Sequence, residues 1–213
     1  ITRCQRPKSH MLALYEKVAH PHGVALLGGA SLLSLLQARI DCERAYAAME
    51  LAHAQKKSPD QVLVVTEMDH FMHVYELFLH SISAMQRLPA SEQDASVALE
   101  RCAADWIERA ARALAQTAGL EASAGLYPLA DDVWTHALEQ HPMHATAYLE
   151  AAQYFQRRDD DKRARQTYKA AVAKQGLDNK ASIVAAWVAF EHARGSPADI
   201  EQAEACLLYT SPS

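Results

Sequence analysis

Apolar residues recur every three or four positions along most of this chain, between short polar stretches that contain Ser, Pro, Asp or Gly. This spacing is typical of amphipathic helices, and no segment alternates apolar and polar residues between turn signals as a half-buried strand does. The one strand-like run, "QVLVV" at 61–65, follows a helix-capping signal and is therefore assigned to a helix. We predict an all-α fold, with helices near residues 9–20, 30–56, 60–87, 92–117, 127–140, 143–158, 161–175, 180–194 and 198–205.

Capping signals mark the ends of these helices. "SPDQ" at 58–61 combines an N-cap serine, a proline at the first helical position and a glutamine three residues after the cap. "SEQD" at 91–94 and "SPAD" at 196–199 repeat the pattern with a carboxylate. Gly119, Gly176 and Gly195 stand where a left-handed C-terminal cap is expected.

Two helical stretches match each other at a spacing of 34 residues, "ADDVWTHALEQHP" from Ala130 and "ARQTYKAAVAKQG" from Ala164. In each stretch an aromatic residue is followed three and four positions later by smaller residues, against which a neighbouring helix could pack closely. The matched pairs are Trp134 with Tyr168, Ala137 with Ala171 and Leu138 with Val172.

The helices that precede these stretches also match. Residues 145–158 align with 180–194 at an offset of 35, give or take one, which pairs Leu149 with Val184, Ala151 with Ala186 and Phe155 with Phe190. A helix–turn–helix unit that repeats at about 34 residues is typical of tetratricopeptide-like arrays. We therefore predict antiparallel helix pairs stacked in a superhelical solenoid over residues 1–205, clearest at 127–205, with a poorer fit at 30–120.

Several of these segments resemble HAT repeats, the half-a-tetratricopeptide units of RNA-processing proteins. "WVAFE" at 187–191 matches the first-helix motif, "ARQTYKAAV" at 164–172 matches the second-helix core, and "LYEKV" at 14–18 matches it in part. The resemblance implies structural repeat positions at Tyr15, Trp134, Ala137, Leu138, Tyr148, Phe155, Ala164, Tyr168, Ala171, Val172, Trp187, Phe190 and Glu191.

More narrowly, residues 129–203 are similar to the last HAT repeats of the spliceosomal U4/U6 snRNP recycling factors, the family of the squamous cell carcinoma antigen recognised by T cells. The segments "VWTHAL", "AYLEAAQYFQRRDD", "ARQTYKAAV" and "FEHARGSPAD" follow one another in the order of that family. The chain departs from the motif at Ala151 and Ala152, where aromatic residues are common, and at Phe155 or Gln156, which replaces the usual Glu.

This resemblance implies a non-enzymatic, cofactor-free scaffold in the nucleus that serves pre-mRNA splicing through U4/U6 snRNP assembly or recycling. Its partners would be spliceosomal or snRNP-associated proteins or a second copy of itself, with RNA bound through recognition motifs outside this stretch. Two scaffold alternatives stay open: a HAT protein of mRNA 3′-end processing and a generic tetratricopeptide adaptor. A third alternative is an all-α metal-dependent enzyme that uses the chain's 11 histidines.

Composition favours protein partners over nucleic acid or membrane. The net charge of −5 and isoelectric point near 6.1 differ from the basic balance of most nucleic-acid binders. The longest apolar run, residues 24–36, is too short to cross a bilayer. The four cysteines are scattered without a CxxC motif, which indicates a reducing compartment and argues against a disulfide framework or zinc site.

Candidate chemistry is sparse. His70, His73 and His80 fall on one helix face, but no HExxH motif accompanies them, so solvent-facing or groove histidines are the better interpretation. "HPHG" at 20–23, "HPMH" at 141–144 and the charged run "RRDDDKRAR" at 157–165 are interpreted as turns. "LLGGAS" at 26–31 could place an anion at a helix N-terminus, but it lacks a phosphate-loop frame and a turn between packed helices is favoured. We predict no catalytic, cofactor-binding or metal-binding residue.

The two ends carry expectations of their own. The chain starts at Ile1 without a methionine, so we expect a fragment of a longer protein. The last eight residues, "CLLYTSPS" at 206–213, resemble a translated sequencing adapter, so we expect them to be a non-native tail.

Overall fold

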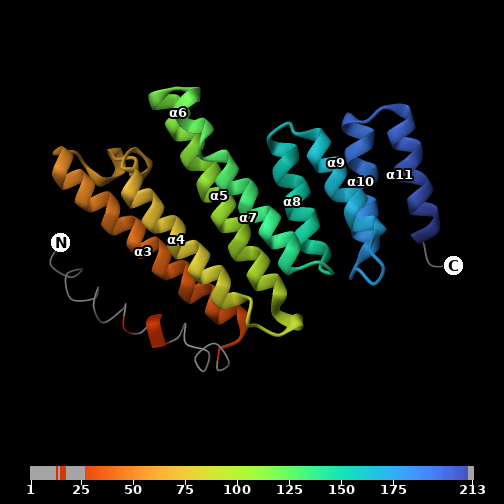
Figure 1. Cartoon of the computed structure of the whole chain (residues 1–213), viewed down its shortest axis with the longest axis horizontal. Helices are drawn as coiled ribbons and strands as arrows, with labels where there is room; N and C mark the ends of the chain where they lie inside the picture. Colours follow the sequence, from red (N-terminus) through yellow and green to blue (C-terminus); the bar gives the residue numbers. More distant parts are fainter. Residues whose placement is uncertain (1–12, 14, 18–26, 211–213) are drawn as a thin grey trace. The chain divides into compact units, whose positions relative to one another are not determined.

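The computed structural model describes residues 13, 15–17 and 27–210, and all of its regular structure is helical (Figure 1). None of the described residues forms a β-strand, which confirms the predicted all-α class. The chain divides into two compact units, an N-terminal unit at Ile1–Trp134 and a C-terminal unit at Thr135–Ser213. The predicted helix at 9–20 lies mostly outside the described residues. Within that range the structure describes residues 13 and 15–17, and these are helical.

Three long helices make up most of the N-terminal unit: α3 (Gly29–Gln55), α4 (Met68–Met85) and α5 (Gln93–Ala118). Each of the three packs against the other two, and α4 lies between its neighbours in the ribbon (Figure 1). A short helix, α6 (Leu120–Ala124), follows α5, and α7 (Tyr127–Gln140) begins in this unit and ends in the next.

Aromatic side chains form the centre of this three-helix core. Phe71 and Phe78 extend from α4 towards Trp106 of α5, with ring centroids 4.7 and 5.3 Å from the Trp106 ring. Leu36 of α3 and Ile107 of α5 are also buried. Burying side chains of this size stabilises a fold by roughly 1.5–3 kcal/mol each, so the core is sufficient to hold the long helices together.

The connection between α3 and α4 corrects the predicted helix at 60–87. The capping box at 58–61 does form, but it begins a single 3₁₀ turn, η1 (Pro59–Gln61), and a second turn, η2 (Val64–Thr66), follows. Val62 between them has an extended backbone, and its side chain is buried with Leu51 and Ala52 of α3. The β-branched valines of this run favour extended backbone, and their burial against α3 outweighs the local capping signal.

Two further capping predictions were wrong. "SEQD" does not supply a serine cap, because residues 90–92 form the 3₁₀ turn η3 (Ala90–Glu92) and Glu92 is the residue before α5. Gly195 has an extended backbone with φ −86°, and its N–H donates to the Glu191 carbonyl at 2.7 Å. Gly119 and Gly176 do have positive φ, at 93° and 80°.

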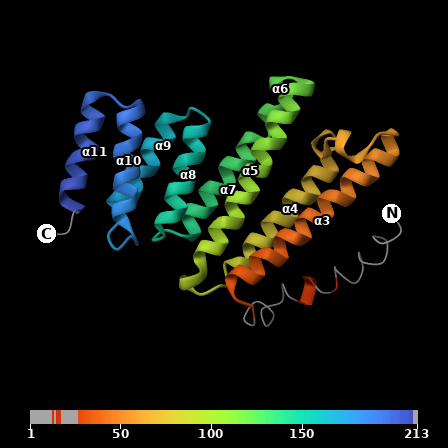
Figure 2. The ribbon, with the colours of Figure 1, turned by 180° about the vertical axis from the view of Figure 1, so that it is seen from behind.

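The C-terminal unit consists of two helical hairpins. Its helices are α8 (Ala145–Arg157), α9 (Asp161–Ala173), α10 (Lys180–Arg194) and α11 (Pro197–Thr210). α8 packs against α9, α10 packs against α11, and α10 also packs against α9 and α8 (Figures 1 and 2). The predicted boundaries agree within two residues except at the end of α11, which continues past 205 to Thr210. The origin of residues 206–213 stays a prediction.

Candidate protein-binding groove

The predicted repeat positions lie in helix cores. Nearly all of them are buried, and only Leu138 and Val172 are half-exposed. The pairs 34 residues apart share their burial, since Trp134 and Tyr168 are both enclosed, as are Ala137 and Ala171. These side chains are therefore structural and are not available to a partner.

The pattern of buried residues aligns α8 with α10 at an offset one residue larger than the predicted 35. At an offset of 35, Leu149 and Ala186 are half-buried where their counterparts are fully buried. At an offset of 36, every buried residue of α10 corresponds to a buried residue of α8. The pairs are then Ala147 with Ile183, Tyr148 with Val184, Ala151 with Trp187, Tyr154 with Phe190 and Phe155 with Glu191.

A buried carboxylate ties α9 to α10. Glu191 is 0% exposed and accepts two hydrogen bonds from Arg165, each 2.7 Å long, and one of 2.8 Å from the Trp187 ring N–H. The hydrogen bond with Glu191 raises the pKa of Arg165. Arg165 also lies 3.6 Å from Asp199 at the start of α11, so one guanidinium connects three helices. The full set of bonds marks this cluster as structural.

The histidines that invited a metal interpretation have ordinary partners. His70 lies 3.4 Å from Glu50, His80 bonds the Glu76 carbonyl at 2.8 Å, and His144 pairs with Asp178 at 2.7 Å. The described part of the chain contains no group of three or more His, Cys, Asp or Glu side chains that could hold a metal ion. "HPHG" at 20–23 lies outside the described residues.

The glycine pair before α3 does meet an anion, and that anion belongs to the chain. The backbone N–H of Gly29, at the first position of α3, donates to the Glu92 carboxylate. A carboxylate at this end is favoured by the helix dipole and by the unpaired N–H groups of the first turn. The favoured interpretation as a turn between packed helices therefore fits, with Glu92 as the N-terminal partner of α3.

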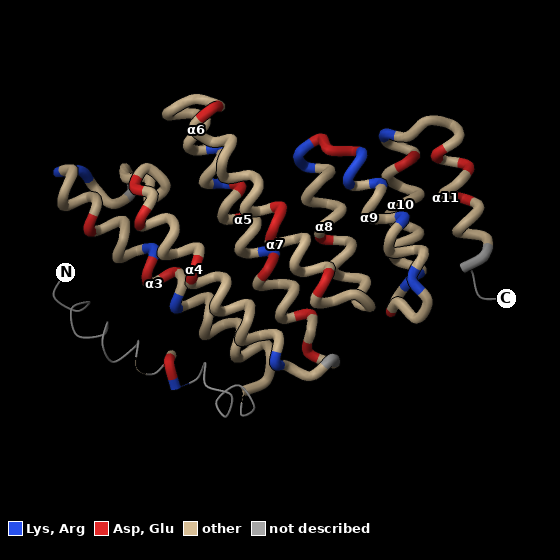
Figure 3. The backbone as a smooth tube through the Cα atoms, viewed as in Figure 1, with Lys and Arg blue, Asp and Glu red and all other residues tan. Residues whose placement is uncertain are grey.

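The charged run at 157–165 spans the end of α8, the turn at 158–160 and the first residues of α9, with three aspartates between basic residues (Figure 3). Asp160 caps α9 by accepting a hydrogen bond of 3.0 Å from the Arg163 backbone. Arg194 of α10 pairs with Asp159 and Asp161, each at 2.9 Å. The run thus joins the two hairpins through Arg194, and residues 158–160 within it form the predicted turn.

A cleft with room for a partner lies in the N-terminal unit, between α3 and α5. It is a cleft of about 600 Å³ that continues into a second cleft of about 300 Å³ sharing four of its lining residues, Asp41, Arg44, Trp106 and Arg109. We call the first cleft the α3–α5 groove. Its walls are stripes at helical spacing on both helices, and its floor includes Phe71 of α4.

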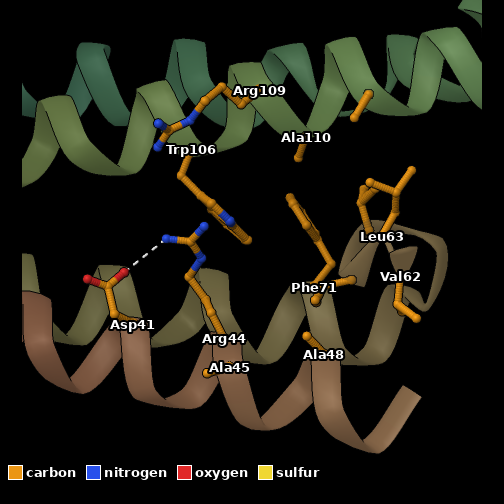
Figure 4. A pocket seen from close by; sticks show the side chains of 13 residues that line it. Asp41, Arg44, Ala45, Ala48, Val62, Leu63, Phe71, Trp106, Arg109 and Ala110 are labelled. Atoms are coloured by element: carbon orange, nitrogen blue, oxygen red, sulfur yellow. Dashed lines mark hydrogen bonds and ion pairs between the residues drawn. The ribbon is translucent and has the colours of Figure 1, made fainter. Parts of the chain in front are cut away.

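The α3–α5 groove has a charged end and an apolar end (Figure 4). At the charged end Arg44 pairs with Asp41 at 3.0 Å, and Arg109 approaches from the opposite wall. At the apolar end are Leu63 and the small side chains of both walls. Lining the apolar end are Ala45, Ala48, Val62, Leu63, Val64, Val65, Phe71, Ala110 and Ala113.

The arginines of the groove differ in their contacts. Arg44 is already paired with Asp41, whereas the guanidinium of Arg109 is exposed and forms no ion pair or hydrogen bond within the described part of the chain. Two guanidinium groups against one carboxylate give this end a net positive charge in a chain whose net charge is −5.

Pattern reasoning did not find this groove. Arg44 and Arg109 look like ordinary solvent-facing positions of amphipathic helices, and the apolar end depends on the turn at 62–65 that was predicted to be helical. The available signal was the row of alanines on both helices at a spacing of three or four residues, which permits an open space between long helices.

Among the described residues, no helix combines the length and the apolar character needed to cross a membrane. Comparison with known proteins gives no match to a protein-family model, to a curated protein or to a solved structure.

Proposed function

We propose that this chain is part of a non-enzymatic, HAT-type protein-interaction scaffold that acts in the nucleus in pre-mRNA splicing, through U4/U6 snRNP assembly or recycling. The observation that carries the proposal is the C-terminal unit, in which two helical hairpins stack through α10. Repeating hairpins of this kind bury a continuous core only when stacked, and they leave extended surfaces for partners.

Contacts at the predicted repeat positions support a repeat. Tyr168 of α9 lies against Phe190 of α10, with ring centroids 5.8 Å apart, and Ala164 and Ala171 on the same face of α9 are fully buried. The buried Glu191 after Phe190 matches the aromatic-Glu ending of the HAT first helix. In the preceding hairpin Phe155 takes the corresponding place, and the Arg163 guanidinium lies 4.2 Å from its ring centre.

The proposal assigns splicing partners from the motif resemblance and a scaffold role from the helix pairing. Its test is affinity purification of the full-length protein from nuclei of its source organism, followed by identification of associated proteins and small nuclear RNAs. U4/U6 snRNP proteins and U6 RNA should be enriched over other snRNPs. Enrichment of 3′-end cleavage factors would support the HAT alternative instead, and enrichment of neither class would contradict both.

A matched pair of variants links this association to the helix array. Glu191→Ala removes the carboxylate that joins α9 to α10, whereas Lys162→Ala changes an exposed residue at the start of α9. The first should lower recovery of the partners and the second should preserve it. Light scattering on the purified protein measures whether the partner is a second copy.

A further inference from the structure

We propose that the α3–α5 groove binds a short acidic and hydrophobic segment of a partner protein, with a large apolar side chain at one end of the groove and a carboxylate at the other. This inference rests on the proposed scaffold function and names the chemistry of one partner. It depends on the separation of charge and apolar surface within the groove (Figure 4).

Both walls change character in the same direction. On α3 the lining residues run from Asp41 and Arg44 to Ala45 and Ala48, and on α5 Arg109 is followed by small residues, Ala110 and Ala113. Seven residues of helix, as from position 41 to 48, rise by about 10 Å, so the charged and apolar ends are about that far apart. A bound segment would need its carboxylate and its apolar side chain at a similar distance, which is about three residues in an extended chain or two turns of helix.

Arg109 is the main anchor for the carboxylate. Its guanidinium is exposed and has no partner within the described residues, so it can receive a carboxylate without first losing an ion pair. Arg44 is paired with Asp41, three residues earlier on the same wall, at 3.0 Å. It adds a second cation near the same place, and planar guanidinium groups bind carboxylates well.

The apolar end has space and a fixed floor. Ala48 and Ala110 leave room on opposite walls, Leu63 and Val64 are half-buried, and Phe71 below them is fully buried. A large aliphatic or aromatic side chain that enters here would remove apolar surface from water. Anchors of this type carry much of the affinity of protein interfaces.

A peptide suits the groove better than single-stranded RNA does. RNA-binding grooves present exposed aromatic faces and a track of cations. Here Phe71 and Trp106 are 0% and 7% exposed and stack on each other at an angle of 15°, so neither offers a free face to a base. Arg109 is the one groove cation without an internal partner in the described part of the chain.

Fluorescence anisotropy tests the proposal with the whole chain. The probe is a short labelled peptide in which Leu and Phe alternate with Glu, and its controls are the same peptide with Lys for Glu and a labelled oligouridylate. The Glu peptide should bind and the Lys peptide should not. Arg109→Glu should weaken binding at least about tenfold, because it turns an attraction into a repulsion.

Two more variants locate the binding. Ala48→Phe fills the apolar end and should also weaken binding, whereas Lys162→Glu makes the same charge change in the C-terminal unit and should leave it within about twofold of the parent. Circular dichroism melting verifies that each variant is folded. Arg109→Glu alters an exposed residue and keeps the test valid if Ala48→Phe does not fold.

The outcomes separate this inference from the function on which it rests. If the Glu peptide fails to bind, or binds Arg109→Glu as well as the parent, the groove assignment is wrong. If the oligouridylate binds and Arg109→Glu abolishes that binding, the groove is a nucleic-acid site and the peptide proposal is overturned. If the groove variants alter peptide binding while the full-length protein recovers no snRNP components, the splicing role fails and the groove assignment stands.

Discussion

The two units of this chain hold their helices together in different ways. In the N-terminal unit, three helices of 27, 18 and 26 residues meet through an aromatic core, and a groove remains between two of them. In the C-terminal unit, helices of 13 to 15 residues meet through buried aromatic and alanine side chains, and specific polar bonds join one helix to the next. Long helices can leave open space along their length, whereas short ones depend on a few residues at fixed positions.

Because of this difference, the residues that stabilise the fold and the residues available for binding lie in different units. The C-terminal unit contains most of the predicted repeat positions, and two of these, Tyr168 and Glu191, are buried. The N-terminal unit contains the exposed Arg109 and the groove, neither of which follows a repeat. We therefore expect mutations in the C-terminal unit to affect stability first and mutations in the groove to affect binding first.

The largest expected effect is at Tyr168. Tyr168→Ala removes a ring that is almost fully buried against Phe190 and leaves the Gln156 amide without its hydrogen bond of 2.8 Å to the Tyr168 hydroxyl. The free energy of unfolding should fall by about 3–5 kcal/mol. Urea denaturation followed by far-ultraviolet circular dichroism measures the loss.

Two substitutions on α9 divide that effect into its parts. Tyr168→Phe keeps the ring and removes the hydroxyl, so it should cost only about 1 kcal/mol. Gln166→Ala changes an exposed residue two positions away and should have little effect. An unfolding curve for Tyr168→Ala that overlays the Gln166→Ala curve would show that Tyr168 does not hold α9 to α10.

The next largest effect compares the stability lost on breaking an ion pair between two helices with the stability lost on breaking one within a helix. Glu191→Ala leaves Arg165 without its two bonds and should lower the free energy of unfolding by about 2–4 kcal/mol, a range reduced because the Arg165 side chain is 23% exposed. In the N-terminal unit, Arg44 pairs with Asp41 on the same helix with both side chains exposed, at 38% and 69%, so Arg44→Ala should cost less than about 1 kcal/mol.

A double-mutant cycle gives the sharper measurement. Arg165→Met, Glu191→Leu and the combined variant yield the coupling energy of the pair, free of the packing lost by each single change. A coupling energy near zero would mean that Trp187 and the helix contacts alone fix α10. The Arg165–Glu191 ion pair would then not be a stabilising feature that sets the C-terminal unit apart from the N-terminal unit.

Periodicity predicted most of the helices because their boundaries depend on local signals. The bounds of α7 and α10 agree with the prediction to the residue, and "SPAD" at 196–199 forms the predicted reciprocal caps. The same local reasoning failed at 62–65, where burial of Val62 against α3 decides the backbone. It failed again at 91–94, where Glu92 bonds a distant helix end.

The candidate site was harder to predict because a groove forms where side chains are too small to fill the space between helices. Small residues on α3 and α5 predict helix contact as readily as they predict open space. The structure resolves that ambiguity only through the lengths of α3, α4 and α5 and the turn that closes the apolar end. The buried role of Glu191 could be expected from the aromatic-Glu motif, but its partners Arg165 and Trp187 could not be assigned from spacing alone.

A smaller effect tests close packing in the N-terminal unit. A Cβ at Gly29 would lie 2.9 Å from a Glu92 carboxylate oxygen and 3.1 Å from the Ala95 Cβ, whereas a Cβ at Gly28 would meet only Glu92, at 3.8 Å. Gly29→Ala should therefore lower the free energy of unfolding by about 1 kcal/mol, since the crowding exceeds the gain in helix propensity.

Gly28→Ala is the matched control for this site, with an ordinary backbone φ of −63° and open surroundings. It should change stability by less than about 0.5 kcal/mol. Equal effects of the two substitutions in urea denaturation would show that Glu92 and Ala95 move aside freely. The contact between the start of α3 and α5 would then be looser than the hairpin contacts of the C-terminal unit.

The smallest expected effect concerns how α11 is attached. Among its residues with described side chains, Ala203 is the only buried one, so α11 depends on polar contacts such as Arg165 with Asp199 at 3.6 Å and His192 with Glu204 at 2.9 Å. Hydrogen bonds from the Ser196 hydroxyl and backbone N–H, with the nearby Arg165 charge, lower the pKa of Asp199 below its ordinary value of 3.8.

A carboxylate whose pKa is lowered by folding stabilises the fold above its unfolded pKa and loses that contribution as the pH falls through its folded pKa. Stability should therefore decline between about pH 5 and pH 2, and Asp199→Asn should flatten that decline. Glu201→Gln removes an exposed carboxylate from the same helix and is the control. Hydrogen exchange should show the amides of α11 losing protection before those of α10 as the pH falls. Simultaneous loss in both helices would mean that the second hairpin opens as one unit, and that α11 is held as firmly as the helices joined through Glu191.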